Sequence, residues 1–234
     1  MLDQAFDELK KYDWGVDPKV LKPLDEAVVA AHGKTDELAK LEERFAAILS
    51  TDAPRSAKDY ACRKLMLIGT AACVPALSAL LADKDLSHMA RYALERIPAA
   101  EAGAALRDAL AKVNGELKIG VLTSLGARGE RENVGAIAQE LGASDPAISR
   151  AAALALGAIP GGTSAAALDK SKVAEGEPTV AATDAKLACA EGLLATGKKS
   201  EALAVYKSLA GEGQPKHVRL AATRGMLACA GKSE

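Results

Sequence analysis

Histidine and cysteine are the residue types in this chain that could bind a metal ion or supply a catalytic nucleophile and its base. His32, His88 and His217 are followed by Gly, Met and Val, so no histidine has a second metal-binding side chain directly after it. A metal site needs several such ligands in one place, and a catalytic Ser or Cys needs a base beside it. No histidine has a sequence neighbour that meets either requirement. We therefore predict three surface histidines, and no catalytic, cofactor-binding or metal-binding residue.

The four cysteines stand at positions 62, 73, 189 and 229, and none forms a CxxC pair. Cys62 and Cys73 lie on opposite sides of an expected turn near Gly69. In an antiparallel helical hairpin, Cys73 would stand about one turn out of register with Cys62. A disulfide needs Cα atoms within roughly 7 Å and would be strained there. We predict buried free thiols that act as small apolar residues.

Phosphate binding has little support in the sequence. The glycine-rich stretches 126–129 and 160–162 lack the Lys-Ser/Thr ending of a phosphate loop and are interpreted as turns. The 30 basic residues are matched by 31 acidic ones, which leaves a net charge of −1. A nucleic-acid-binding wall needs a cationic surplus on one face. We therefore expect no nucleic-acid partner.

The composition favours closely packed helices. Hydrophobic residues make up 49% of the 234 residues and charged residues 26%, which is typical of a globular protein. Aromatic residues make up only 3%, and the apolar residues are mostly Ala and Leu. Such side chains suit close helix packing better than a β-sandwich. No apolar run is long enough to span a membrane, and the N-terminus does not resemble a signal peptide. We expect either a cytoplasmic protein or one whose leader has been removed.

A pair made of alanine and an aliphatic residue recurs five times. Its second residue always lies twelve positions after another aliphatic residue, called here the anchor. The anchors and their partners are Leu65 and Leu77, Leu94 and Leu106, Leu125 and Ile137, Leu156 and Leu168, and Leu193 and Val205. A fixed offset with variable spacing is typical of a repeated module of a first and a second helix. Met226 would anchor a sixth first helix whose partner falls beyond residue 234, so we expect an incomplete last repeat and a fragment of a longer protein.

Small or medium apolar residues stand four positions before each anchor, and mostly small ones stand directly before it. They form a smooth stripe on each first helix that a neighbouring helix can approach closely. The stripe consists of Ala61 and Lys64, Ala90 and Ala93, Val121 and Ser124, Ala152 and Ala155, Cys189 and Gly192, and Ala222 and Gly225. In the second helices an apolar residue returns four positions after the partner, except in the fourth unit, where Lys172 stands.

Turn-forming residues stand where the repeat pattern predicts helices to start and end. Asp145-Pro146 predicts a capped helix start, and Pro178 and Pro215 mark similar starts. Gly69, Pro98, Gly129 and residues 160–162 would end first helices. A loop is expected across Asp169 to Thr179. Residues 1–50 do not follow the repeat, and we expect helices there over about 2–11, 17–32 and 35–50. This division predicts an N-terminal helical cap, residues 1–53, plugged by Trp14, and a repeat array, residues 54–234.

Residues 68–97 and 144–157, which include Val74-Pro75-Ala76-Leu77 and Ser144-Asp145-Pro146, resemble HEAT-like repeats. The likeness is closest to the bacterial kind related to phycobilisome lyases, and it extends over about 54–231. It departs from the pattern at Ser87 and Lys172. It implies an all-α fold, an α-solenoid in which antiparallel helix pairs form an ARM/HEAT-like right-handed superhelix. HEAT-like hydroxylases hold iron with paired His-Glu steps, which are absent from this sequence.

The resemblance implies a function only in broad terms. We expect a non-enzymatic protein-interaction or scaffold module with an extended concave helical surface, an unknown protein partner and no membrane partner. The protein would be a monomer or part of a larger chain. The alternative is a lyase-like or chaperone-like enzyme subunit that holds a small cofactor or peptide in its groove, and nucleic-acid binding is a weaker alternative. A likeness to HEAT modules of large exported bacterial proteins favours an exported or periplasmic location over a cytoplasmic one.

Overall fold

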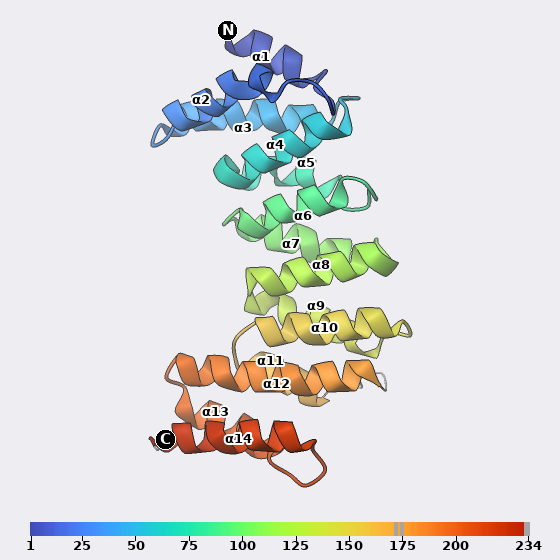
Figure 1. The fold of residues 1–234 in the computed structure, drawn as a ribbon, viewed down its shortest axis with the longest axis vertical. Coiled ribbons are helices and arrows are strands. Elements are labelled where there is room, and N and C mark those ends of the chain that lie inside the picture. The colour runs from blue at the N-terminus through green and yellow to red at the C-terminus, as the bar shows by residue number, and fades with distance from the viewer. Residues whose placement is uncertain (171–172, 174–175, 232–234) are drawn as a thin grey trace. The chain divides into compact units, whose positions relative to one another are not determined.

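The computed structural model describes residues 1–170, 173 and 176–231, without the side chain of Pro178. These residues form fourteen α-helices, four short 3-10 helices and no strand, which confirms the all-α prediction (Figure 1). Contacts divide the chain into one unit of residues 1–113 and a second that begins at Asn114. The expected boundary after residue 53 lies inside the first unit. The division into a cap and a repeat array stays a prediction.

The first unit begins with three helices close to the expected ranges. Its elements are α1 (Leu2–Leu9), η1 (Pro18–Leu21), α2 (Lys22–Ala30), α3 (Thr35–Leu49), α4 (Arg55–Ile68), η2 (Ala71–Cys73), α5 (Val74–Ser78), α6 (Ser87–Arg96) and α7 (Ala100–Ala109). Helix α4 contacts both α3 and α6, and α5 contacts both α3 and α7. The helices of this unit therefore pack on one another in two alternating rows.

Phenylalanine, and not Trp14, fills the interior of the N-terminal helices. The ring of Phe45 is fully buried, with its centroid 5.0 Å from that of Phe6 and 6.2 Å from that of Tyr60. The prediction for Trp14 was wrong, because its side chain is 79% exposed. The Asp13 carboxylate accepts hydrogen bonds from Trp14 N at 2.8 Å and Ser56 Oγ at 3.0 Å, and so holds the turn against α4 by its backbone. The indole ring of Trp14 therefore lies in solvent, outside the interior of these helices.

A buried carboxylate joins α3 to the next helical segment. Glu42 is 3% exposed and accepts hydrogen bonds from Thr70 N at 2.7 Å, Thr70 Oγ1 at 2.9 Å and Cys73 N at 3.1 Å. These donors lie at the start of η2, where backbone N–H groups lack helical partners. Glu42 therefore caps η2 from another helix. Glu42 also lines a cavity of about 470 Å³, together with Ala39 and Ala72 among others.

The second unit continues the alternation of long and shorter helices. Its elements are α8 (Gly115–Arg128), η3 (Arg131–Asn133), α9 (Val134–Gln139), η4 (Glu140–Gly142), α10 (Pro146–Ala158), α11 (Gly162–Lys170), α12 (Glu177–Ala195), α13 (Lys199–Leu209) and α14 (Lys216–Cys229). Within this unit α8, α10, α12 and α14 lie side by side in one row, and α9, α11 and α13 in a second row (Figure 1).

Several predicted helix ends agree with the structure of the second unit. Asp145 caps α10 by accepting a hydrogen bond from Ala147 N at 2.9 Å, and Gly129 ends α8 with a φ of 68°. Both ends of the stretch expected to be a loop, Asp169 to Thr179, are helical, because α11 continues through Lys170 and α12 begins at Glu177. The irregular Lys172 lies outside the described residues.

The repeat positions are buried almost throughout. The anchors Leu65, Leu94, Leu125, Leu156 and Leu193 are at most 1% exposed, and Leu77, Leu106, Ile137 and Leu168 are at most 3% exposed. Only Val205 and Met226 are half-buried. Neighbouring first helices approach closely: a Cβ on Gly126 would lie 2.8 Å from Ala155 Cα, and one on Gly157 would lie 2.9 Å from Ala185 Cα. Small residues therefore allow these helices to approach closely, but of the residues in these contacts only Ala155 belongs to the predicted stripe.

Candidate binding groove

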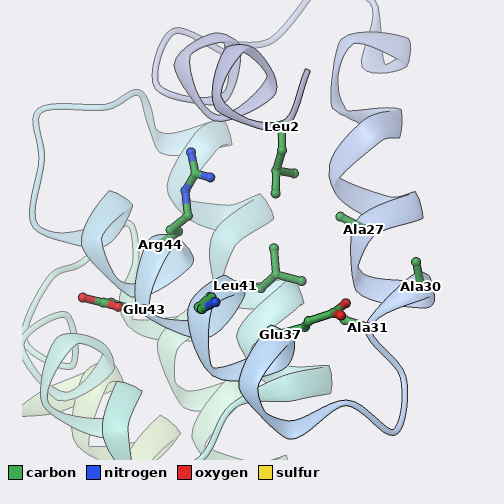
Figure 2. A pocket seen from close by; sticks show the side chains of 9 residues that line it. Leu2, Ala27, Ala30, Ala31, Glu37, Leu41, Glu43 and Arg44 are labelled. Atoms are coloured by element: carbon green, nitrogen blue, oxygen red, sulfur yellow. The ribbon is translucent and has the colours of Figure 1, made fainter.

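A cavity of about 440 Å³ opens between α1, α2 and α3. Its apolar wall consists of Ala27, Ala30 and Ala31, whose side chains end at Cβ and leave space between α2 and α3. Leu2 and Leu41 point toward each other across that space from α1 and α3 (Figure 2). The result is an apolar hollow large enough for a bulky side chain. We call it the α1–α3 groove.

Charged side chains of both signs surround the groove. Glu37, Lys40, Glu43 and Arg44 of α3 complete its lining. The Arg44 guanidinium is already engaged, because it lies 3.9 Å above the centre of the Phe6 ring and 2.8 Å from an Asp3 carboxylate oxygen. Glu37 has Lys34 Nζ at 3.3 Å. The groove therefore combines an apolar interior with a rim that carries charges of both signs.

The α2 wall is held against α4 by a polar cluster behind it. Tyr60 Oη donates a hydrogen bond of 2.6 Å to Asp25 Oδ1, and Lys64 Nζ lies 2.5 Å from the same oxygen. Burial, and then the hydrogen bond to Asp25, raise the pKa of Tyr60 well above its usual value. Burial opposes ionisation of Asp25, but the hydrogen bonds from Lys64 and Tyr60 hold its carboxyl pKa below the usual value. Asp25 therefore stays ionised and fixes the wall near neutral pH.

Exposed apolar residues also gather elsewhere. Val29, next to the groove on α2, is 75% exposed. Leu154 of α10 and Val180 of α12 are 47% and 57% exposed, and they line a cavity of about 330 Å³ with Arg150, Glu177 and Asp184. Apolar residues that are exposed singly are ordinary on protein surfaces, so these positions do not by themselves mark a contact with another protein.

Basic residues are few in the described helices α5, α7, α9 and α13, taken one by one. Helices α5 and α9 contain no Lys or Arg, and Arg107 of α7 is followed directly by Asp108. Helix α13 carries Lys199 and Lys207, with Glu201 between them. In α7 and in α13 the basic residues therefore stand among acidic ones.

The histidines are exposed, as predicted, and are spread over the chain. Among the described residues no three His, Cys, Asp or Glu side chains gather in a way that could hold a metal ion. The cysteines are free thiols, of which Cys62, Cys73 and Cys189 are buried and Cys229 is half-buried. Burial raises the pKa of Cys62 and of Cys73 to about 12, and that of Cys189 to about 11.

The reactivity of each cysteine thiol should depend on how deeply the side chain is buried. At pH 8 we expect a thiol reagent such as DTNB to modify Cys229 in the folded protein and the other three only after unfolding, since the thiolate is the reactive species and its formation is suppressed at the raised pKa values. Counting modified thiols before and after adding denaturant measures this. Cys229→Ser should abolish the early reaction. Early modification of Cys62 or Cys73 would contradict the burial.

The groove could not be predicted from the sequence pattern. Alanines at positions 27, 30 and 31 are ordinary in a helix, and they form the wall of a cavity only because of where α1 lies.

No described helix has both the length and the apolar character needed to cross a bilayer. No protein-family model matches the chain. A search of curated proteins gives no significant match either.

Proposed function

We propose that this chain is a non-enzymatic protein-interaction module whose α1–α3 groove receives an apolar side chain from a helix of a partner protein. The observation that carries the proposal is the groove itself, an alanine-walled hollow of about 440 Å³ with charges of both signs at its rim. Burying one large aliphatic side chain in such a hollow contributes about 1.5–3 kcal/mol. Helices that are already packed lose little conformational entropy on binding.

We further propose that the helices belong to a HEAT-like α-solenoid. Support comes from the row arrangement within each unit and from the burial of the repeat anchors. A solenoid suits the proposed role, because each helix pair adds surface without needing a new core. The exposed pair Leu154 and Val180 offers a second apolar spot for the same class of partner.

The lyase-like alternative, in which the groove holds a polar cofactor, has less support. A small-molecule site usually has polar groups that converge on the ligand. Here the guanidinium of Arg44 is directed to Asp3 and Phe6, and the interior is lined by alanine and leucine. Nucleic-acid binding has the least support, because α5 and α9 carry no basic residue and those of α7 and α13 stand among acidic ones.

Blocking the groove tests the proposal. Ala30 is exposed at the groove wall, so Ala30→Trp should fill the hollow and leave the fold intact. In affinity capture from a lysate of the source cells, we expect proteins that are retained by the wild type to be lost with Ala30→Trp. Amide hydrogen exchange of the purified complex should then show protection in α2 and α3.

The matched control is Ala100→Trp, which puts the same side chain on an exposed position at the start of α7. Retention by the wild type and by Ala100→Trp, but not by Ala30→Trp, supports the proposed function. If all three proteins retain the same set, or if protection is confined to helices other than α2 and α3, the proposed role of the groove is wrong.

A further inference from the structure

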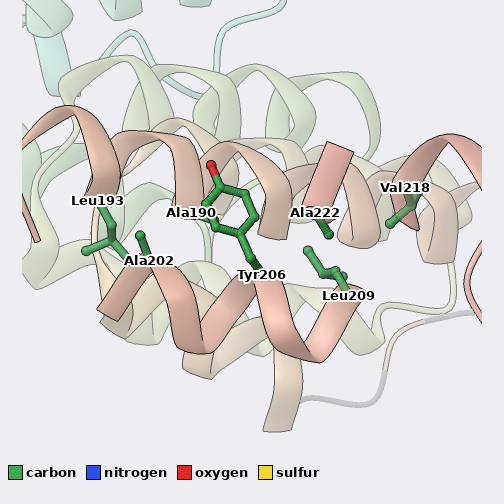
Figure 3. Packing of buried hydrophobic residues seen from close by; sticks show 7 residues of the cluster. All are labelled: Ala190, Leu193, Ala202, Tyr206, Leu209, Val218 and Ala222. Atoms are coloured by element: carbon green, nitrogen blue, oxygen red, sulfur yellow. The ribbon is translucent and has the colours of Figure 1, made fainter. Parts of the chain in front are cut away.

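Glu42 is the only Asp or Glu that is buried among the described residues, with 3% of its surface exposed. Buried acidic side chains are rare unless a cation lies beside them, because an ionised carboxylate loses its hydration on burial. For comparison, the packed cluster around Tyr206 and Leu209 in the second unit consists of hydrophobic side chains (Figure 3). Packing alone therefore does not explain why the carboxylate of Glu42 lies inside.

The hydrogen bonds of Glu42 leave part of its carboxylate unused. None of the ion pairs formed by the described residues includes Glu42. Three neutral donors reach Oε1, namely Thr70 N, Thr70 Oγ1 and Cys73 N. Among the described residues Oε2 has only the Thr70 hydroxyl, at 2.9 Å, and that hydroxyl has one proton to share between the two oxygens. Oε2 can therefore accept a further hydrogen bond.

The cavity that Glu42 lines has room for a ligand and carries charge of one sign. Its volume of about 470 Å³ falls within the range of small-molecule sites. The charged residues of its lining are Glu42 and Glu43, without any Lys, Arg or His. In the α1–α3 groove, by contrast, Lys40 and Arg44 accompany the acidic residues. The apolar residues of the cavity are Leu38, Ala39, Ala46, Ile68 and Ala72.

We propose that this cavity binds a small organic ammonium ion, whose nitrogen donates a hydrogen bond to Glu42 Oε2 and whose hydrocarbon part lies against Ala39 and Ile68. The ammonium group supplies the positive charge that the buried carboxylate lacks. A metal ion is a poorer fit, because among the described residues no three His, Cys, Asp or Glu side chains gather in a way that could hold one. The site does not depend on the proposed function, since its lining shares only Glu43 with the α1–α3 groove.

Calorimetric titration of the purified full chain with hexylammonium chloride is the first measurement. Hexanol has the same hydrocarbon part without the charge, and hexanoate carries the opposite charge. We expect saturable one-to-one binding of hexylammonium, at least about tenfold tighter than that of hexanol, because hydrogen bonds to charged groups are the stronger ones. Hexanoate should not bind. In NMR spectra, the amide shifts that change most should belong to residues 35–46 and 68–73, which include the whole lining.

Two variants separate the charge of the site from its space. Glu42→Gln keeps an oxygen that can accept from Thr70 N and Cys73 N but removes the charge, so it should weaken hexylammonium binding at least about tenfold. Ala39→Trp fills the cavity from an exposed position and should abolish binding. The matched control is Ala47→Trp, at an exposed position of the same helix outside both linings, which should bind like the wild type.

Circular dichroism melts establish that each variant is folded, and if Glu42→Gln is not, Ala39→Trp decides. The absence of saturable binding, equal affinities for hexylammonium and hexanol, unchanged binding by Ala39→Trp, or shift changes confined to other helices would each overturn the inference. Ala30 lines only the α1–α3 groove, so Ala30→Trp should bind hexylammonium normally. Failure of the proposed function in the capture assay would therefore leave this site unaffected.

Discussion

Replacing Phe45 with alanine is expected to lower the free energy of unfolding by about 3–5 kcal/mol. The ring is fully buried between Phe6 and Tyr60, with centroid separations of 5.0 and 6.2 Å. Its removal leaves a cavity that the neighbours cannot fill, because Tyr60 is hydrogen-bonded to Asp25 and Phe6 lies under Arg44. Urea titration followed by circular dichroism measures the loss.

Tyr92→Ala is the matched control for Phe45→Ala. It removes an aromatic ring from α6 of the same unit, but the side chain is 40% exposed. The expected change is within about 0.5 kcal/mol, as for most surface substitutions. Equal losses for the two variants would mean that the Phe6–Phe45–Tyr60 cluster is not the core of these helices.

Gly126→Ala is expected to destabilise the second unit by about 1–3 kcal/mol, although alanine is the better helix former. The added Cβ would lie 2.8 Å from Ala155 Cα, so α8 and α10 must move apart. The nearest atom belongs to the backbone of α10, which cannot move aside as easily as the end of a flexible side chain can. Gly157→Ala should act in the same direction, since its Cβ would lie 2.9 Å from Ala185 Cα.

Gly135→Ala supplies a control of opposite sign. Gly135 is also helical, in α9, but a Cβ there would meet nothing within 4 Å. The change should therefore stabilise the protein, by up to about 1 kcal/mol. Thermal and urea unfolding measure the change in stability for Gly126→Ala and Gly135→Ala, and the test needs only the sign of each change. Stabilisation by both substitutions would show that α8 and α10 are not in close contact in solution.

The repeat pattern predicted most helix positions because each first helix needs a small stripe, an anchor and a turn residue. Gly69, Gly129 and Asp145 lie at the predicted helix ends, and Leu77 and Ile137 are buried as expected. These features are local, or repeat at a fixed offset, so they can be read without knowing the tertiary structure.

Features that depend on contacts between distant segments could not be predicted in this way. Glu42 resembles any solvated glutamate of an amphipathic helix until η2, 28 residues later at Thr70, is placed against it. The exposure of Trp14 likewise follows from a distant contact, because the hydrogen bond from Ser56 to Asp13 determines which side of the turn faces inward. The groove likewise exists only because α1 lies across α2 and α3.

The short length of α1 has a consequence for the groove. A helix of eight residues does not persist alone in water, so α1 exists only while Phe6 and Leu9 are inserted into the core. Detachment of α1 would remove Leu2 and open the hollow on one side. Any guest that touches Leu2 would in turn hold α1 in place. Occupancy and the local order of the first nine residues are therefore thermodynamically linked, and each should increase the other.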